Sequence, residues 1–175
     1  MYVRESEEFD EFYTGSVRRV TGYVYALTGD RGETEDLVQE AYARAWHQWE
    51  LVRAHGDPEA WVRTVAYRVR VSRWRRLTAG VRAHRRHGAA PDVPELNVDY
   101  VAIITALREL PAQQRRAVVL HHLVGLSVEE IAAETGVAAG TVKSRLARGR
   151  ALLASLLDPA EPETKPFRKE AHSHA

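Results

Sequence analysis

The segment from Gly125 to Leu153, GLSVEEIAAETGVAAGTVKSRLARGRALL, restricts the fold more than any other part of this chain. Its SVEE run begins with Ser127 and ends with Glu130, the form of a capping box in which each side chain accepts a hydrogen bond from the other residue's backbone amide. Gly136 can adopt the left-handed conformation that ends a helix, and a second helix is predicted to begin near Ala139. The segment therefore predicts two short helices joined by a tight turn.

The second of these helices has an apolar face and a small, basic face. The apolar face follows an i, i+4, i+7, i+11 spacing, which predicts burial of Val142, Leu146, Gly149 and Leu153. The residues left pointing outward are Lys143, Ser144, Ala147, Arg148 and Ala151. Such a helix fits the major groove of duplex DNA as the second helix of a helix-turn-helix, whereas an ordinary helical hairpin would use the same turn without binding DNA.

The outward residues of this helix suit different contacts with DNA. Lys143 and Arg148 can read guanine edges, and the small Ala147 permits close approach. Ser144 can bond to a base or to a phosphate. The arginines nearer the sides of the helix, Arg145 and Arg150, suit phosphates, which fix position more than they specify sequence.

Apolar residues recur at helical spacing through most of the remaining sequence. They predict helices over residues 9–27, 33–49, 98–110 and 112–123, and one that begins near Glu59 and runs into an arginine-rich stretch. Asp57 and Pro58 suit the N-cap and the first position of that helix. No segment shows the alternation typical of a strand, so the predicted fold is all-α.

A run with one glycine and two prolines, residues 88–94, interrupts this periodicity and predicts a linker. The predicted organisation is two small helical domains joined by a Pro/Gly linker, the second domain containing the helix-turn-helix. Its boundaries are residues 1–88, 89–98 and 99–157, followed by a proline-containing, highly charged tail over residues 158–175 that is predicted to be disordered.

The net charge of +1 conceals a strong segregation of acids and bases. Acids outnumber bases over residues 1–59, whereas residues 62–90 hold nine arginines and no acid. A second acid-free block covers residues 135–157. Two separate basic patches favour two contacts with a polyanion such as nucleic acid, although a solvated face in an arginine-rich protein would give the same pattern.

The basic stretch from Trp61 to Arg76, WVRTVAYRVRVSRWRR, combines six arginines and three large aromatic residues without an acid. A helical wheel places Val62, Val65, Ala66 and Val69 on a stripe toward the core, and on the opposite stripe Arg63, Tyr67, Arg70 and Trp74. Exposed rings beside arginines suit unpaired bases, on which they stack while the cations follow the phosphates. The same rings would equally suit packing under a neighbouring helix.

Composition excludes several classes of function. The chain has no cysteine, which excludes disulfides, thiolate metal sites and cysteine nucleophiles. The acidic N-terminus is unlike a signal peptide and no apolar run reaches membrane-spanning length, so a cytoplasmic protein without membrane insertion is expected. Adjacent His121 and His122 would point about 100° apart on a helix, and His172 and His174 lie in the tail, so no metal site is expected. The sequence shows no Gly-rich phosphate loop, zinc signature or serine-histidine-acid grouping, so no cofactor or enzymatic activity is expected.

Three stretches stand in a telling order and spacing: ETEDLVQEAYARAWHQW (33–49), the basic stretch 61–76, and ALRELPAQQRRAVVLHHLVGLSVEEIAAETGVAAGTVKSRLARGRALL (106–153). Together they resemble the extracytoplasmic-function, or group IV, sigma factors of the sigma-70 family of bacterial RNA polymerase, and the resemblance covers residues 9–157. In that family the first stretch grips the polymerase, the second melts the minus 10 promoter element and the third binds the minus 35 element. The arginine excess and the YALTGD and VSRWRR runs resemble actinobacterial members.

The resemblance implies roles for individual residues. The implied polymerase-binding residues are Asp36, Gln39, Glu40 and Trp46. The residues implied to meet and melt the minus 10 element are Trp61, Arg63, Tyr67, Arg68, Arg70 and Trp74, and loop 52–60 is implied to capture a flipped base. The implied minus 35 residues are Thr141, Lys143, Ser144, Arg145, Ala147, Arg148 and Arg150. The family frequently has asparagine where Arg68 stands and aspartate where Ser72 stands, a pattern that this chain lacks.

The partners that the resemblance implies are core RNA polymerase, through its β′ clamp helices and β flap, and promoter DNA, with an anti-sigma protein as a further candidate. Two other functions also fit the residues. A helix-turn-helix regulator would bind duplex DNA without polymerase and would not need the acidic helix 33–49. An adaptor for single-stranded nucleic acid would tolerate shuffling of the outward residues of the last helix.

Overall fold

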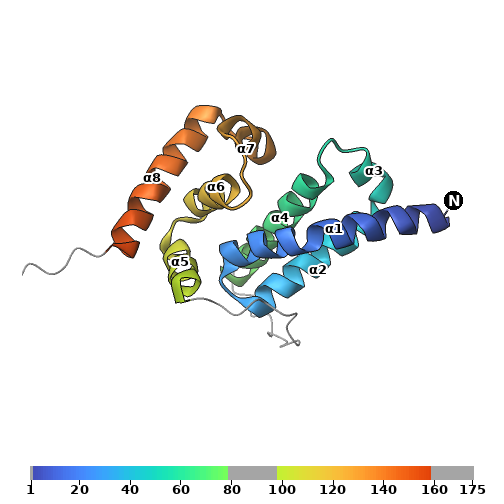
Figure 1. The fold of residues 1–175 in the computed structure, drawn as a ribbon, viewed down its shortest axis with the longest axis horizontal. Coiled ribbons are helices and arrows are strands. Elements are labelled where there is room, and N and C mark those ends of the chain that lie inside the picture. The colour runs from blue at the N-terminus through green and yellow to red at the C-terminus, as the bar shows by residue number, and fades with distance from the viewer. Residues whose placement is uncertain (1, 79–97, 159–175) are drawn as a thin grey trace, which may run out of the picture.

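The computed structural model of the chain describes residues 2–78 and 98–158. Within these residues the secondary structure consists of eight α-helices without a strand (Figure 1), which confirms the all-α prediction. The predicted tail from residue 159 onward lies outside the described residues, as does the predicted linker 89–98 apart from Val98.

The first domain contains four helices: α1 (Tyr2–Thr28), α2 (Arg31–His47), α3 (Trp49–Arg53) and α4 (Pro58–Thr78). Helix α1 packs against both α2 and α4, and it begins seven residues before the predicted start at Phe9. Asp30 caps α2 by accepting a hydrogen bond from the backbone N–H of Glu33 at 2.7 Å. Asp57 caps α4 in the same way through Ala60, at 2.9 Å, which confirms the predicted start of that helix.

The predicted helix 33–49 is wrong at its C-terminal end. Gln48 leaves the helical conformation, with φ −124° and ψ 28°, and Trp49 begins the separate helix α3. The ring of Trp49 is 8% exposed and lies 5.2 Å from the ring centroids of both Phe9 and Phe12. The break was invisible in the periodicity because a one-residue interruption leaves the spacing of apolar residues nearly unchanged.

The second domain also contains four helices: α5 (Val98–Glu109), α6 (Ala112–His122), α7 (Val128–Thr135) and α8 (Ala139–Leu157). The predicted break at Pro111 and the predicted pair of helices on either side of Gly136 are both present. Helix α8 packs along α6 and α7, so the helix-turn-helix rests on the rest of this domain.

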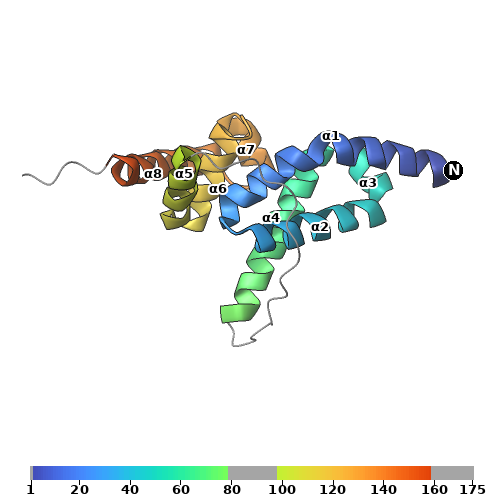
Figure 2. The same cartoon turned by 60° about the horizontal axis from the view of Figure 1, so that its bottom comes forward.

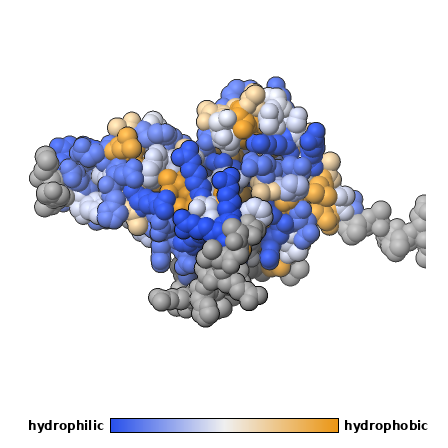
Figure 3. Space-filling view, turned by 180° about the vertical axis from the view of Figure 1, so that it is seen from behind, coloured by the Kyte–Doolittle hydropathy of each residue, from blue (hydrophilic) through white to orange (hydrophobic). Residues whose placement is uncertain are grey.

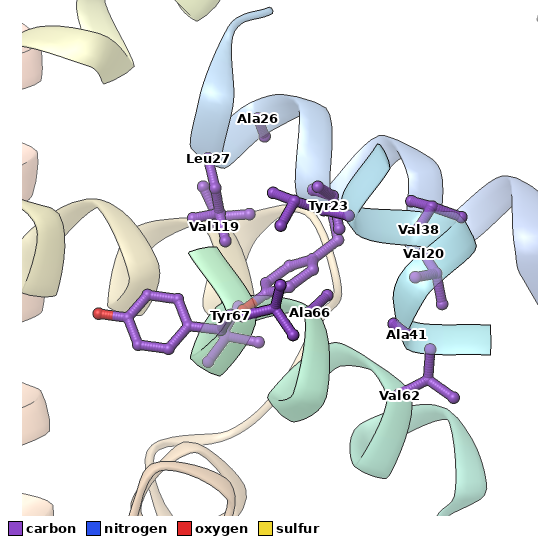
Figure 4. Packing of buried hydrophobic residues seen from close by; sticks show 14 of the residues in the cluster. Val20, Tyr23, Ala26, Leu27, Val38, Ala41, Val62, Ala66, Tyr67 and Val119 are labelled. Carbon is purple, nitrogen blue, oxygen red and sulfur yellow. The ribbon is translucent and has the colours of Figure 1, made fainter. Parts of the chain in front are cut away.

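The two domains share one apolar cluster. Val119 of α6 lies beside Leu27 of α1, close to the buried residues of α4 (Figure 4). The rings of Tyr25 and Tyr100 also stack across the boundary, with centroids 6.2 Å apart. The C-terminal half of α4 projects away from the body of the molecule (Figure 2). The domain interface therefore meets α4 only along part of its length.

Candidate nucleic-acid interface

The turn of the helix-turn-helix is built as the sequence predicts. The Ser127 hydroxyl accepts a hydrogen bond from the backbone N–H of Glu130 at 3.2 Å, and the Ser127 N–H donates to the Glu130 carboxylate at 2.8 Å. Gly136 ends α7 with φ 69°, the left-handed region that favours glycine. These contacts fix the direction in which α8 leaves the turn.

The hydrogen bonds from Ser127 lower the pKa of the Glu130 carboxyl below its ordinary value of 4.5. The carboxylate therefore stays ionised at the N-terminus of α7, where a negative charge is favoured by the exposed amides of the first turn.

Helix α8 presents the outer face that the sequence predicts. Val142, Leu146 and Gly149 are buried and Leu153 is half-buried, so the apolar face packs against the domain. The exposed residues of the opposite face include Thr141, Lys143, Ser144, Ala147, Arg148 and Arg150, whereas Arg145 is half-buried. A small, basic and solvent-facing surface on the second helix of a helix-turn-helix has the shape and charge to enter a major groove.

Helix α4 has the predicted core stripe but not the predicted outer stripe. Val62, Ala66 and Val69 are buried in the core. The opposite stripe was expected to face solvent, and this is wrong for Arg63 and Tyr67, which are only 3% and 7% exposed. The reason is the second domain, because α6 and α7 cover this part of α4.

Arg63 is held by carboxylates from both domains. Its Nη2 donates to Glu134 Oε2 of α7 at 2.8 Å, and its guanidinium lies 3.4 Å from Glu59 and 3.6 Å from Asp57. Burial alone would lower the pKa of Arg63, but the Glu134 hydrogen bond and the three carboxylate charges outweigh it and raise the pKa. Arg63 is therefore a fully charged group in a buried ion pair.

Tyr67 packs under the second domain. The guanidinium carbon of Arg116 lies 3.9 Å from the centroid of the Tyr67 ring, and Gln113 Nε2 donates to the Tyr67 hydroxyl at 3.1 Å. Of the two interpretations that the sequence left open for this ring, packing under a neighbouring helix is the one observed.

The remaining predicted residues of α4 differ in exposure. Arg68 and Trp74 are exposed, the latter at 64%, and Trp61 is half-buried. Arg70 lies 3.4 Å from the Glu33 carboxylate of α2, and Arg73 makes a similar contact with α2. The back of the molecule is mostly hydrophilic, with small separate hydrophobic patches (Figure 3). The C-terminal half of α4 carries several arginines and one large exposed aromatic ring, that of Trp74.

The predicted polymerase-binding residues lie on α2. Asp36, Gln39 and Trp46 are exposed, and Glu40 is half-buried beside Arg44, to which it is bonded at 2.7 Å. The Trp46 ring is 43% exposed, and its centroid lies 5.0 Å from that of Phe9. This part of α2 thus combines an acidic surface with an exposed aromatic ring.

An open hollow of about 480 Å³ lies beside the predicted base-capturing loop. Its walls come from α1, α3 and the start of α4, and Asp57, Pro58 and Glu59 of the loop contribute to them. Arg19 and Arg53 also reach the hollow, and Arg19 bonds to Glu59 at 2.6 Å. The hollow is therefore polar and of mixed charge.

Three residues at the domain boundary were not found from the sequence. Arg115 donates to the carbonyl oxygens of Leu27, in the last turn of α1, and of Leu110, which directly follows α5. Arg116 and Glu134 enclose the Arg63 and Tyr67 side chains. Nothing in the sequence pattern could have identified them, because periodicity does not show which surfaces of two domains meet.

The described residues hold no cluster of three metal-ligating side chains, and none of their helices is both long and apolar enough to cross a membrane. The rings of His121 and His122 meet edge to face, and His121 Nδ1 lies 2.8 Å from the Leu126 carbonyl oxygen.

Comparison with known proteins matches both domains to one family. Residues 12–79 match sigma-70 region 2, and residues 100–153 match sigma-70 region 4. The sigma-E factor of Streptomyces coelicolor is 30% identical over 165 residues, which cover 93% of each chain. The extracytoplasmic-function sigma factor SigL of Mycobacterium tuberculosis is 34% identical over 131 residues, covering 71% of this chain and 74% of SigL.

A solved structure agrees with these relatives. The sigma factor RpoE from Bartonella quintana, in complex with the anti-sigma factor NepR, aligns with a TM-score of 0.71 and 26% identity over 89% of this chain and 99% of RpoE. The family matches of both domains and the relatives decide against a polymerase-independent regulator and against a single-strand adaptor. The chain belongs to the extracytoplasmic-function group of the sigma-70 family, and it is an RNA polymerase sigma factor that directs core polymerase to promoters.

Proposed function

We propose that α8 binds the minus 35 element, that the projecting half of α4 binds the melted minus 10 element, and that α2 grips the β′ clamp helices of polymerase. The single observation that carries the proposal is the outer face of α8, which is exposed, small and basic while the opposite face is buried. Lys143 and Arg148 on this face have the length and charge to read guanine edges, and Ala147 between them allows close approach.

The role of α4 rests on its exposed ring and cations. Trp74 belongs to the C-terminal half of α4, the half that projects from the body (Figure 2), and Arg68 is exposed at the middle of the helix. Stacking of an unpaired base on an aromatic ring contributes about 1 to 3 kcal/mol, and arginines nearby can follow the phosphates. Opening a base pair costs a few kcal/mol per base, so capture of several unpaired bases would offset melting.

Loop 52–60 is proposed to capture one flipped base, supported by the open hollow that its residues help to form. Arg19 and Arg53 supply donors there, and Asp57 and Glu59 supply acceptors, which together suit the polar edge of a base. Trp61, directly after the loop and half-buried, is proposed to stand at the upstream edge of the melted region.

The role of α2 is supported by its acidic surface and its exposed ring. Asp36 and Glu40 would attract a basic partner surface, and Trp46 would supply the buried apolar contact that gives such interfaces much of their affinity. The β flap and an anti-sigma protein are proposed as further partners, the latter because the related RpoE was solved with one. The chain would act in the cytoplasm and leave the chemistry of RNA synthesis to the polymerase.

Promoter opening by core polymerase with this chain tests the proposal. Permanganate reactivity of promoter thymines reports the melted region, and holoenzyme formation is measured in parallel. Trp74→Ala and Trp61→Ala are expected to reduce thymine reactivity while binding to polymerase is retained. Leu77→Ala, which removes an exposed apolar side chain from the same end of α4, is the matched control and should leave opening unchanged. Unchanged reactivity in both tryptophan variants would contradict the assignment of α4.

A further inference from the structure

We infer that His122, the last residue of α6, is a further DNA contact, which binds a backbone phosphate together with Arg150 of α8 and takes up a proton from solvent when it does so. This inference rests on the proposed binding of α8 to the minus 35 element. It goes further because it adds a residue from outside the helix-turn-helix and makes binding to duplex DNA depend on pH.

His122 and Arg150 come from two helices that pack together. Helix α6 lies beside α8 (Figure 1), and a Cβ on Gly149 of α8 would overlap the side chain of Val118 of α6. His122 stands one helical turn after Val118, and Arg150 directly follows Gly149. Both side chains are exposed, so they reach the surface from adjoining parts of the contact between α6 and α8.

Arg150 belongs to the DNA-facing surface of α8. Lys143, Ala147 and Arg150 follow an i, i+4, i+7 spacing, which places them on one stripe of the helix, and all three are exposed. His122 therefore extends this stripe onto α6. A phosphate that Arg150 binds at the end of the stripe would lie within reach of the His122 imidazole.

The turn that leads from α6 into α7 holds His122 in place. His121 Nδ1 donates to the Leu126 carbonyl oxygen at 2.8 Å, and the Leu126 N–H donates to the Leu120 carbonyl oxygen at 3.0 Å. The His121 ring meets the His122 ring edge to face, with centroids 4.7 Å apart. In a helix-turn-helix the first helix crosses the DNA backbone while the second enters the groove, so the turn before α7 suits a phosphate contact.

The surroundings of His122 favour its neutral form in the free protein. Partial burial, the adjoining His121 and the Arg150 guanidinium lower the pKa of His122 below its ordinary value of 6.5. No acid of the described residues opposes this, although Glu129 and Glu130 begin the neighbouring helix α7. A DNA phosphate would supply the missing negative charge, and an opposite charge at contact distance favours the protonated imidazole.

The direction of the pH dependence follows from the free and bound states. The His122 pKa is lowered in the free protein and higher in the complex, so binding takes up a proton. Below the pKa of the free protein His122 is charged in both states, and the affinity is highest. The affinity falls as the pH rises from the free pKa to the bound pKa and is constant again above it. A rise of one unit in pKa corresponds to an affinity change of about tenfold.

Proton NMR of the full-length protein measures the His122 pKa directly, and His122→Gln identifies its signal. We expect a pKa below 6.5 in the free protein and a higher one in Arg150→Ala, which removes the neighbouring cation. A bound duplex, selected for binding from a random-sequence pool, should raise the His122 pKa by about one unit or more. A pKa that the duplex leaves unchanged overturns the phosphate contact.

The affinity for the same duplex, measured by fluorescence anisotropy over about pH 5 to 8, supplies the second readout. The affinity of the unaltered protein is expected to fall about tenfold more over this range than that of His122→Gln. At the acidic end His122→Gln should also reduce the slope of log affinity against log salt by about 1. His47→Gln, which removes an exposed histidine from α2, is the matched control and should keep the full pH dependence.

Lys143→Ala separates this contact from the role of α8. It should weaken binding at every pH and leave the pH dependence unchanged. If Lys143→Ala weakens binding while His122→Gln keeps the pH profile of the unaltered protein, the His122 contact is overturned and the role of α8 stands. If Lys143→Ala binds as tightly as the unaltered protein, the role of α8 is contradicted, whereas a rise of the His122 pKa on adding the duplex would still support a DNA contact at the end of α6.

Discussion

Gly149 of α8 lies against Val118 of α6 so closely that a Cβ on the glycine would come within 2.7 Å of the valine Cγ2 atom. Alanine ordinarily stabilises a helix interior by about 1 kcal/mol over glycine, but overpacking a core costs about 1 to 3 kcal/mol. Because the branched Val118 side chain has little freedom to move, Gly149→Ala is expected to lower the free energy of unfolding by about 1 kcal/mol. Urea denaturation measures this change.

Gly140 of the same helix supplies the control, because a Cβ there meets open space. Gly140→Ala is expected to raise the free energy of unfolding by up to about 1 kcal/mol. A stabilising effect of both substitutions would show that the contact between α8 and α6 is looser than the structure has it.

The capping box at the start of α7 makes the stability of the second domain sensitive to acid. Ser127→Ala removes the hydroxyl that accepts from the Glu130 N–H, and it should lower the free energy of unfolding by about 1 kcal/mol. The pKa of Glu130 is lowered in the folded protein, so its contribution is present above its ordinary pKa of 4.5 and is lost as the pH falls through the lower folded value.

Glu130→Gln isolates this titration. The difference in unfolding free energy between Glu130→Gln and the unaltered protein should shrink as the pH falls from 4.5 through the lower pKa of the folded protein, because Glu130 then becomes neutral in the folded state too. Chemical denaturation in a series of buffers measures it. A difference that stays constant across that range would contradict the hydrogen bond from the Ser127 amide.

Trp46 and Trp49 lie three residues apart, and replacing them with alanine should affect different properties, polymerase binding for the first and stability for the second. Trp49 is buried against Phe12, so Trp49→Ala is expected to cost about 3 to 5 kcal/mol of stability. Trp46 is 43% exposed, so Trp46→Ala should cost about 1 kcal/mol or less but weaken binding to core polymerase by about 2 kcal/mol if it is an interface anchor. Competition for labelled core polymerase and thermal unfolding separate the two effects.

The accuracy of sequence-based prediction follows the range of the interactions involved. The buried face of α8 was predicted correctly because Val142 and Leu146 meet partners within their own compact domain, and helical periodicity reports that burial directly. The cap at Ser127 is more local still, since its hydrogen bonds span three residues. Interactions between residues this close in sequence can therefore be predicted from the sequence alone.

The stripe of α4 that was expected to face solvent shows what cannot be predicted from the sequence alone. The wheel correctly separated Val62 from Arg63, yet it had no means of showing that Glu134, 71 positions further along the chain, would cover the arginine. A polar stripe predicts only that a face does not join the apolar core of its own domain. Whether water, DNA or another domain covers it depends on contacts between residues far apart in sequence.

The basic residues of α8 are expected to have two different roles, some contacting the bases of the DNA and others contacting its phosphates. Lys143→Ala and Arg148→Ala, on the exposed outer face, are expected to weaken minus 35 binding by about 1 to 3 kcal/mol for the preferred sequence and less for altered sequences. Arg150→Ala should instead weaken binding to all sequences similarly and reduce the slope of log affinity against log salt by about 1, because one phosphate contact is lost. Fluorescence anisotropy with duplexes that carry single base changes, at several salt concentrations, measures both quantities. If Arg150→Ala altered base preference while Arg148→Ala altered only the salt slope, the orientation of α8 in the groove would have to be rotated from the one proposed.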